Sequence, residues 1–367
     1  MKIESGQVRL FRVDPRTTWI FLELRAGEYT GYGEALETTD PRLFAAALSL
    51  QVERLTGMAA DSATPPAKAL AGEKATGLME ASIHATVDQA LWDLRAQQVG
   101  LPLHRLLGPT LRTAIKLYAN INRGTRDRTP EGFAVRAKAA VDDGFDAVKL
   151  APFDGLTRAN GQTKTGREAL ALGVERVQAV RAAIGEGPRL MVDCHSRFGL
   201  ANALTFLERT AHTRVDWFED ALPYNDMAAW EHLRAVSPSP LVGGETARGV
   251  KDLLPFLERG IWDVVMPDIR FFGGVTELNS LSALVEQFQI QLAPHNPRGP
   301  VATLASGHVM ASCPVFDHLE FQYRECEDRD PTWREQLGYG AEVIRDGHLH
   351  LGEAPGLGFR FNADVPG

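Results

Sequence analysis

Cysteine is scarce in this chain, positive charge is not in excess, and long apolar runs are missing. The three cysteines, Cys194, Cys313 and Cys326, are too few and too scattered for a disulfide framework or a cysteine-based zinc site. A formal net charge of −8 gives no general attraction for nucleic acid or acidic lipid. No apolar run approaches the ~18 residues of a membrane span, and the first residues lack a signal-peptide core. These absences favour a cytoplasmic protein with a small soluble partner and neither nucleic-acid nor membrane partners.

The composition is that of a globular protein, with 367 residues of which 44% are hydrophobic and 23% charged. Such a chain can form one large domain, or one large and one small. Within it, the run "RLMVDCHSRFG" at 189–199 starts as a buried strand and ends in Asp193 and His195. These two side chains lie two residues apart, so period-two geometry points both to the same side of a strand.

Five more apolar runs end in a comparable residue, which gives the series Asp193, Glu219, Glu245, Asp268, His295 and Glu320, with steps of 26, 26, 23, 27 and 25 residues. A strand, a helix and two short loops sum to roughly that period. The segments between the runs, such as 227–236 and 275–288, have the three- and four-residue apolar spacing of amphipathic helices.

Two earlier strands are predicted within 114–124 and 144–155, the second ending at Lys149. Eight parallel strands with outer helices form a TIM-type barrel, in which the carboxyl ends of the strands meet at one mouth. We therefore expect the strand-end residues to face one cavity: Lys149, Asp193, Glu219, Glu245, Asp268, His295 and Glu320.

A single acidic residue at a strand end is more often a loop residue or a helix N-cap than a metal ligand. Three carboxylates on successive strand ends are different, because Asp193, Glu219 and Glu245 would repel one another strongly in a barrel mouth. A bound divalent cation relieves that repulsion. All-oxygen ligation favours Mg²⁺, with Mn²⁺ as the alternative, over zinc.

Two of the ten histidines occupy chemically suggestive places. His295 ends a strand, and Asp268 ends the preceding one, so the carboxylate can orient the imidazole as a dyad. His195 follows the third strand, on the far side of the predicted metal. The other eight histidines are assigned no chemistry.

With these residues in view, the chain resembles the enolase superfamily, in its mandelate racemase-like branch. The segments "TTWIFLELRAGEYTGYGEA", "ATVDQALWDLRAQQVGLPLHRLLG" and "PGLGFRFN" are similar to landmarks of that family's capping domain. The resemblance implies an α/β fold with a modified TIM barrel, (β/α)7β, at 113–324. It also implies an α+β capping domain at 1–112 that the C-terminal segment 325–367 completes.

The resemblance also implies roles for the strand-end residues. Asp193, Glu219 and Glu245 would bind Mg²⁺, and His295 with Asp268 would form the general-base dyad. Glu320, expected to be protonated, and Lys149 would stabilise the enolate. Many relatives carry a second lysine two residues after the first, whereas this chain has Ala151, which argues against a two-base racemase. Asp220 stands where relatives commonly have a second glutamate.

Asp193-x-His195 and the later "APHNPRGPVA" resemble the acid-sugar dehydratases, galactonate dehydratase in particular. The implied reaction removes the C2 proton of an aldonate with His295 and expels the 3-hydroxyl with help from His195. The alternatives are a racemase or epimerase of a 2-hydroxy acid and a catalytically silent sugar-acid-binding barrel. We also expect a homo-oligomer.

Polar residues after several strands are predicted to contact the hydroxyls of a sugar-acid substrate. A role in stabilising loops is about as plausible for each of them, so they are weaker candidates than the strand-end residues. They are Asn120, Asn122, Arg123, Arg197, Asn296 and Arg298.

Overall fold

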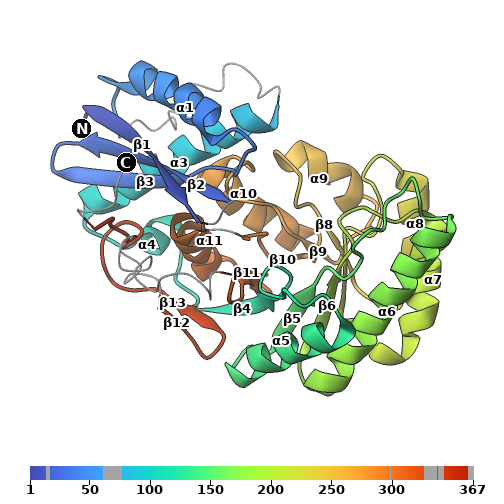
Figure 1. The fold of residues 1–367 in the computed structure, drawn as a ribbon. Helices are drawn as coiled ribbons and strands as arrows, with labels where there is room; N and C mark the ends of the chain where they lie inside the picture. The colour runs from blue at the N-terminus through green and yellow to red at the C-terminus, as the bar shows by residue number, and fades with distance from the viewer. Residues whose placement is uncertain (14–16, 61–76, 298, 326–336, 338–342, 363–367) are drawn as a thin grey trace.

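The computed structural model describes the chain except for residues 14–16, 61–76, 298, 326–336, 338–342 and 363–367. Figure 1 shows a small sheet with its helices beside a larger array of strands and helices. The small sheet comes from the N-terminal part of the chain, and the larger array from the part that follows it.

The small sheet is antiparallel and contains β1 (Ser5–Arg12), β2 (Thr18–Ala26) and β3 (Tyr29–Glu34). Helices α1 (Pro41–Leu55) and α3 (Leu78–Val99) pack against it around an apolar cluster. The approach of α3 to β3 is so close that a Cβ at Gly33 would lie 2.0 Å from the Thr86 carbonyl oxygen. The glycines of "GYGE" therefore permit the contact between this sheet and α3.

The larger array is a parallel barrel. Its strands are β4 (Ala114–Asn120), β5 (Ala147–Leu150), β6 (Arg189–Asp193), β7 (Trp217–Glu219), β8 (Leu241–Gly243), β9 (Val264–Val265), β10 (Gln291–Leu292) and β11 (Leu319–Gln322). They pair in chain order from β4 to β10, and β11 pairs with β4. A parallel bridge between Leu292 and Phe316 joins the two ends and closes the barrel.

Seven α-helices connect these eight strands within the described residues, as the (β/α)7β prediction requires. They are α5 (Pro130–Asp142), α6 (Lys164–Ile184), α7 (Leu200–Thr210), α8 (Met227–Val236), α9 (Val250–Leu257), α10 (Gly274–Gln287) and α11 (Pro300–Ser312). A short 3-10 turn, η1 (Ala211–Thr213), follows α7. None of the helices in the described ranges is long and apolar enough to span a membrane.

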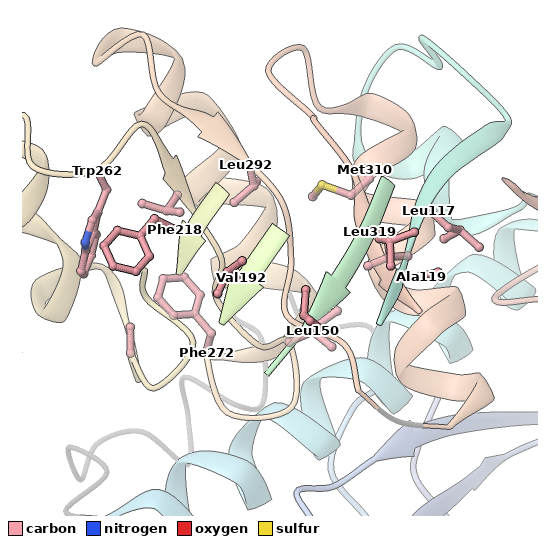
Figure 2. Packing of buried hydrophobic residues seen from close by; sticks show 14 of the residues in the cluster. Leu117, Ala119, Leu150, Val192, Phe218, Trp262, Phe272, Leu292, Met310 and Leu319 are labelled. Atoms are coloured by element: carbon pink, nitrogen blue, oxygen red, sulfur yellow. The ribbon is translucent and has the colours of Figure 1, made fainter. Parts of the chain in front are cut away.

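Side chains alternate between two buried clusters along the barrel strands. One cluster contains Tyr118, Met191 and Trp217 and fills the barrel interior. The other contains Leu150, Val192 and Phe218 together with residues of the surrounding helices such as Val177 and Phe206. Figure 2 shows these three side chains along the barrel strands. Asp193 and Glu219 follow the inward set by two residues, so period-two geometry directs them into the mouth.

The strand ends differ in detail from the sequence prediction. β6 and β7 end at Asp193 and Glu219, as expected, but β8 ends at Gly243, two residues before Glu245. β9 and β10 are two-residue strands that end three residues before Asp268 and His295. Those side chains therefore lie on loops just beyond the strands, where the chain can turn them toward the barrel axis.

The C-terminal part contacts both regions. β12 (Val343–Arg345) and β13 (His348–His350) form a hairpin, and β13 pairs antiparallel with β4 of the barrel. Farther on, Phe359 and Phe361 pack edge-on against Tyr32 of the small sheet. The short helix α4 (Leu103–Leu107) connects the two regions.

Two buried carboxylates attach the capping region to the barrel. Glu34 at the end of β3 accepts backbone hydrogen bonds from Gly299 (2.8 Å) and Ala302 (3.0 Å) at the start of α11. Asp88 of α3 accepts from the Thr276 amide (3.0 Å) and hydroxyl (2.6 Å) at the start of α10. These carboxylates satisfy helix N-termini that otherwise leave N–H groups unpaired.

A buried pair of histidines lies between α4 and α11. The rings of His104 and His308 stack, with their Nδ1 atoms 3.1 Å apart. Burial lowers the pKa of His308 to about 3, from an ordinary value of 6.5. Between these pH values the unfolded chain binds more protons than the folded one, so stability falls as pH drops below 6.5.

We expect the free energy of unfolding to decrease by roughly 2–3 kcal/mol more in wild type than in His308→Asn between pH 7 and pH 4.5. Urea unfolding at both pH values measures this difference. His212→Asn, at an exposed histidine, is the control and should follow wild type. Equal pH dependence of wild type and His308→Asn would contradict the prediction.

Candidate metal centre and acid–base site

Three carboxylates meet at the barrel mouth. Asp193 and Glu219 are the last residues of β6 and β7, and Glu245 lies two residues beyond β8. One oxygen from each lies within 4.8 Å of the others. Glu219 is fully buried and Asp193 nearly so. Three adjacent strands thus supply an all-oxygen donor set of the kind that Mg²⁺ prefers, and the residues fit that ion.

Two glycines allow Glu245 to reach this position. A Cβ at Gly243 would lie 2.5 Å from the Trp262 ring, so only glycine fits beneath that side chain. Gly244 has φ +111°, a conformation that side-chain-bearing residues rarely adopt. The sequence "GGE" therefore turns the chain sharply off β8 and returns a carboxylate toward β7.

The pKa shifts of the three carboxyl groups show that their negative charges repel one another. Burial raises the pKa of Glu245 well above its usual value, and Asp220, Asp193 and Glu219 raise it further. Burial likewise raises the pKa of Glu219, although Lys149 opposes the shift. Burial would also raise the pKa of Asp193, but His195 lowers it below the usual value. A cation bound among the three carboxylates would offset most of their repulsion.

Lys149 supplies one positive charge beneath the cluster. Its Nζ lies 2.7 Å from Glu219 Oε1, 3.3 Å from Glu320 Oε1 and 5.0 Å from the centre of the Tyr118 ring. Burial would lower the pKa of Lys149, but Glu219 and Glu320 raise it well above its usual value. Lys149 is therefore a fixed cation and has no free pair with which to act as a base.

Glu320 is held by hydrogen-bond donors on both oxygens. Asn120 Nδ2 donates to Oε1 (2.6 Å), and the backbone N–H of Asn296 donates to Oε2 (3.0 Å). Burial would raise the pKa of Glu320, but Lys149, His295 and these donors lower it to about 2. These contacts favour an ionised Glu320, whereas we expected a protonated one from the sequence.

His295 and Asp268 form the predicted dyad. His295 Nδ1 donates to Asp268 Oδ2 at 2.8 Å, and its Nε2 lies 3.4 Å from Glu245 Oε2. Asp268 is fully buried and also accepts the backbone N–H and the guanidinium of Arg270. Burial would raise the pKa of Asp268, but Arg270 and His295 lower it below its usual value. The dyad thus presents an Nε2 atom beside a carboxylate of the acidic cluster.

His195 lies next to the same cluster and, unlike His295, contacts Asp193 through both its backbone and its ring. Its backbone N–H donates to Asp193 Oδ1 (2.8 Å), and its Nε2 lies 2.9 Å from Asp193 Oδ2. The Asp193 carboxylate raises the pKa of His195, against the effect of burial. Its φ of 48° and that of Ser196, 53°, turn the chain tightly after β6. The imidazole is 38% exposed and lies within reach of solvent.

The weaker substrate candidates make contacts within the chain. Asn120 and Asn296 bond to Glu320, as described above. Asn122 Oδ1 accepts from Arg128 (2.9 Å), Arg123 pairs with Glu325 (2.7 Å), and Arg197 donates to the Phe153 carbonyl (2.8 Å). Arg298 lies outside the described residues. Contact with a substrate stays a prediction for all six.

Sequence reasoning missed three residues that support the site. Trp217 Nε1 donates to Glu219 Oε2 (2.6 Å), Arg270 holds Asp268, and the Tyr224 hydroxyl donates to Asp220 (2.6 Å). Trp217 and Arg270 each lie two residues from the carboxylate they contact. Both can be found from the sequence as hydrogen-bond donors two residues away from a strand-end carboxylate. Tyr224 lies four residues from its partner, on a loop, and no comparable pattern identifies it.

Comparison with known proteins gives a consistent result. The family model described as "Enolase C-terminal domain-like" matches residues 132–365. The model "Mandelate racemase / muconate lactonizing enzyme, N-terminal domain" matches residues 14–108. A solved mandelate racemase/muconate lactonizing enzyme from Jannaschia sp. CCS1 has a TM-score of 0.88 at 22% identity, covering 100% of this chain and 96% of its own.

Two curated relatives are dehydratases. D-gluconate dehydratase from Thermoproteus tenax is 33% identical over 77% of this chain, and the match spans 54% of that relative's length. D-galactonate dehydratase from Pectobacterium atrosepticum is 27% identical over 100% of this chain and 93% of its own length. The chain thus spans about half of the first relative and most of the second.

The repulsion among the carboxylates predicts an effect on stability. In EDTA at pH 8, Glu245→Gln should raise the thermal midpoint of the protein, by about 1–2 °C for each kcal/mol of repulsion removed in a chain of 367 residues. Added Mg²⁺ should raise the midpoint of wild type more than that of the variant. Calorimetry measures both effects, with the exposed Glu175→Gln as control. A lower thermal midpoint for Glu245→Gln in EDTA would contradict the prediction that repulsion at Glu245 destabilises the metal-free protein.

Proposed function

The chain belongs to the mandelate racemase/muconate lactonizing enzyme family of the enolase superfamily, and we propose that it is a metal-dependent hydro-lyase acting on an aldonic acid. The product would be a 2-keto-3-deoxy acid. Relatives that are 33% and 27% identical carry the names D-gluconate dehydratase and D-galactonate dehydratase, which supports this reaction class. A cytoplasmic location and a homo-oligomeric state are parts of the same proposal.

The observation that carries the proposal is the position of His295 beside the acidic cluster. Its Nε2 lies 3.4 Å from Glu245 Oε2, while its Nδ1 is bonded to Asp268. A substrate carboxylate held at the cluster places its C2 proton near this nitrogen. Proton removal next to a carboxylate builds up negative charge, so the reaction needs a base and a cation at adjacent points.

Asp193, Glu219 and Glu245 would hold Mg²⁺, with Mn²⁺ as the alternative. When bound, the ion supplies positive charge at the substrate carboxylate and its 2-hydroxyl, where charge develops as the C2 proton leaves. Enolase-superfamily sites that combine a lysine or histidine base with Mg²⁺ are a known pattern. Lys149 adds a fixed positive charge from below the cluster.

His295 then acts as the base. Because its Nδ1–H is donated to Asp268, its Nε2 carries the free electron pair that accepts the C2 proton. Asp268 stabilises the imidazolium that results, and Arg270 keeps Asp268 ionised and in place. Glu320, held by Asn120 and Asn296, lies beside the same nitrogen of His295, with its Oε2 3.8 Å from Nε2.

His195 acts as the acid on the other side. It gives its proton to the 3-hydroxyl, the C3–O bond breaks, and water leaves. The enol that remains takes a proton at C3 and loses the proton of its 2-hydroxyl, which gives the 2-keto-3-deoxy acid. Without a bound ion, the Asp193 carboxylate raises the pKa of His195, which favours the protonated imidazole that an acid needs.

The two histidines predict different isotope patterns. In deuterium oxide, His295→Asn should lose both C2 exchange and dehydration, by at least the ~10²–10⁴-fold typical of acid–base catalysis. His195→Asn should lose dehydration but retain C2 exchange. Proton NMR of the substrate measures exchange, and semicarbazide measures the keto acid. Equal loss of exchange and dehydration in the two variants would contradict separate roles for His295 and His195. Exchange at C2 without any dehydration by the wild-type protein would indicate an epimerase.

The proposed roles of His295 and His195 predict which configuration at C2 and C3 the substrate has. D-Gluconate and D-galactonate share the configuration at C2 and C3 and differ at C4, so His295 and His195 face the same hydrogen and hydroxyl in both. We expect dehydration of one or both, with galactonate as the leading candidate, and none of D-mannonate, which is inverted at C2. A screen of mono- and diacid sugars tests this. Dehydration confined to acids of the opposite C2 configuration would contradict the placement of His295.

A further inference from the structure

The Tyr224 hydroxyl connects the strand ends that carry two of the three carboxylates. It donates to Asp220 Oδ1 at 2.6 Å and accepts the backbone N–H of Gly244 at 2.9 Å. Asp220 directly follows Glu219, and Gly244 directly precedes Glu245. One phenol oxygen therefore links the neighbours of both carboxylates.

Both ends of this link have unusual backbone conformations. Asp220 has φ 42° and Gly244 has φ +111°, outside the regions that extended strands occupy. A chain in such conformations needs contacts that hold it there. The Asp220 backbone N–H donates to Val242 (3.0 Å), and its carbonyl accepts from Ser196 (2.6 Å). The Tyr224 hydroxyl is the side-chain contact that joins this turn to the turn after β8.

The Tyr224 ring is itself fixed by packing. Phe256 and Trp262 meet it edge-on, with ring centres 5.7 and 5.5 Å away. Trp262 also fills the space that a Cβ at Gly243 would need. The ring position therefore depends on the same aromatic group that shapes the "GGE" turn, and the hydroxyl is held at a defined point between β7 and β8.

We propose that Tyr224 is a positioning residue for the metal centre, which sets the separation of the Glu219 and Glu245 carboxylates through Asp220 and Gly244. The inference rests on the proposed metal site. Removing the hydroxyl breaks the side-chain link between the two turns while leaving all three carboxylates and the ring packing in place. Loss of such an outer contact typically weakens metal affinity 10–100-fold.

The test is Mg²⁺ binding by isothermal titration calorimetry to the full chain, for wild type, Tyr224→Phe and Tyr323→Phe. Tyr323 also donates its hydroxyl to a carboxylate, Asp143 at the end of α5, and is the matched control. We expect Tyr224→Phe to raise the Mg²⁺ dissociation constant at least 10-fold and Tyr323→Phe to leave it unchanged. The metal-free thermal midpoint separates this effect from a general loss of stability, which would lower the midpoint and leave the affinity intact.

A second pair of variants tests the link from its other end. Asp220→Asn and Asp220→Ala remove the same charge, but only asparagine keeps an oxygen that can accept from Tyr224. The inference predicts weaker Mg²⁺ binding for Asp220→Ala than for Asp220→Asn, and no such difference in the Tyr224→Phe background. Unchanged affinity in Tyr224→Phe, with tight binding by wild type, would overturn the role of Tyr224 alone. Failure of wild type to bind Mg²⁺ would overturn the metal site itself.

Discussion

The mutual repulsion of three neighbouring carboxylates, two of them buried, is the constraint on which the site depends. Asp193, Glu219 and Glu245 place oxygen atoms within 4.8 Å of one another, where the surrounding protein screens charge poorly. Lys149 offsets part of that charge, and a divalent cation would offset the rest. Holding like charges this close lowers the stability of the fold, and folds commonly carry such a cost at functional sites.

The capping region is attached to the segments that carry His295 and Asp268. Glu34 and Asp88 accept hydrogen bonds at the first turns of α11 and α10. These helices begin shortly after His295 and Asp268, so the contacts that attach the cap also fix the loops of the dyad. The position of His295, the base of the proposed reaction, is therefore set by both regions of the chain.

The repeat of apolar runs ending in acidic residues was sufficient to predict the barrel, because period two and the βα spacing are local properties of the sequence. The acidic cluster and the His295–Asp268 pair followed from the rule that parallel strands end at one mouth. Other features depend on contacts between distant segments. Glu320 is held by Asn120 and Lys149 from other strands, and the Tyr224 hydroxyl contacts Asp220 from a loop whose path no periodicity describes.

Diffraction from crystals soaked in Mn²⁺, with data collected at the manganese absorption edge, tests the central claim most directly. The repulsion described above predicts one strong anomalous peak bounded by the carboxylates of Asp193, Glu219 and Glu245, which disappears when crystals of the Glu219→Gln protein are soaked in the same way. A peak at another position, or the same peak in Glu219→Gln, would contradict the claim that these three residues form a metal centre.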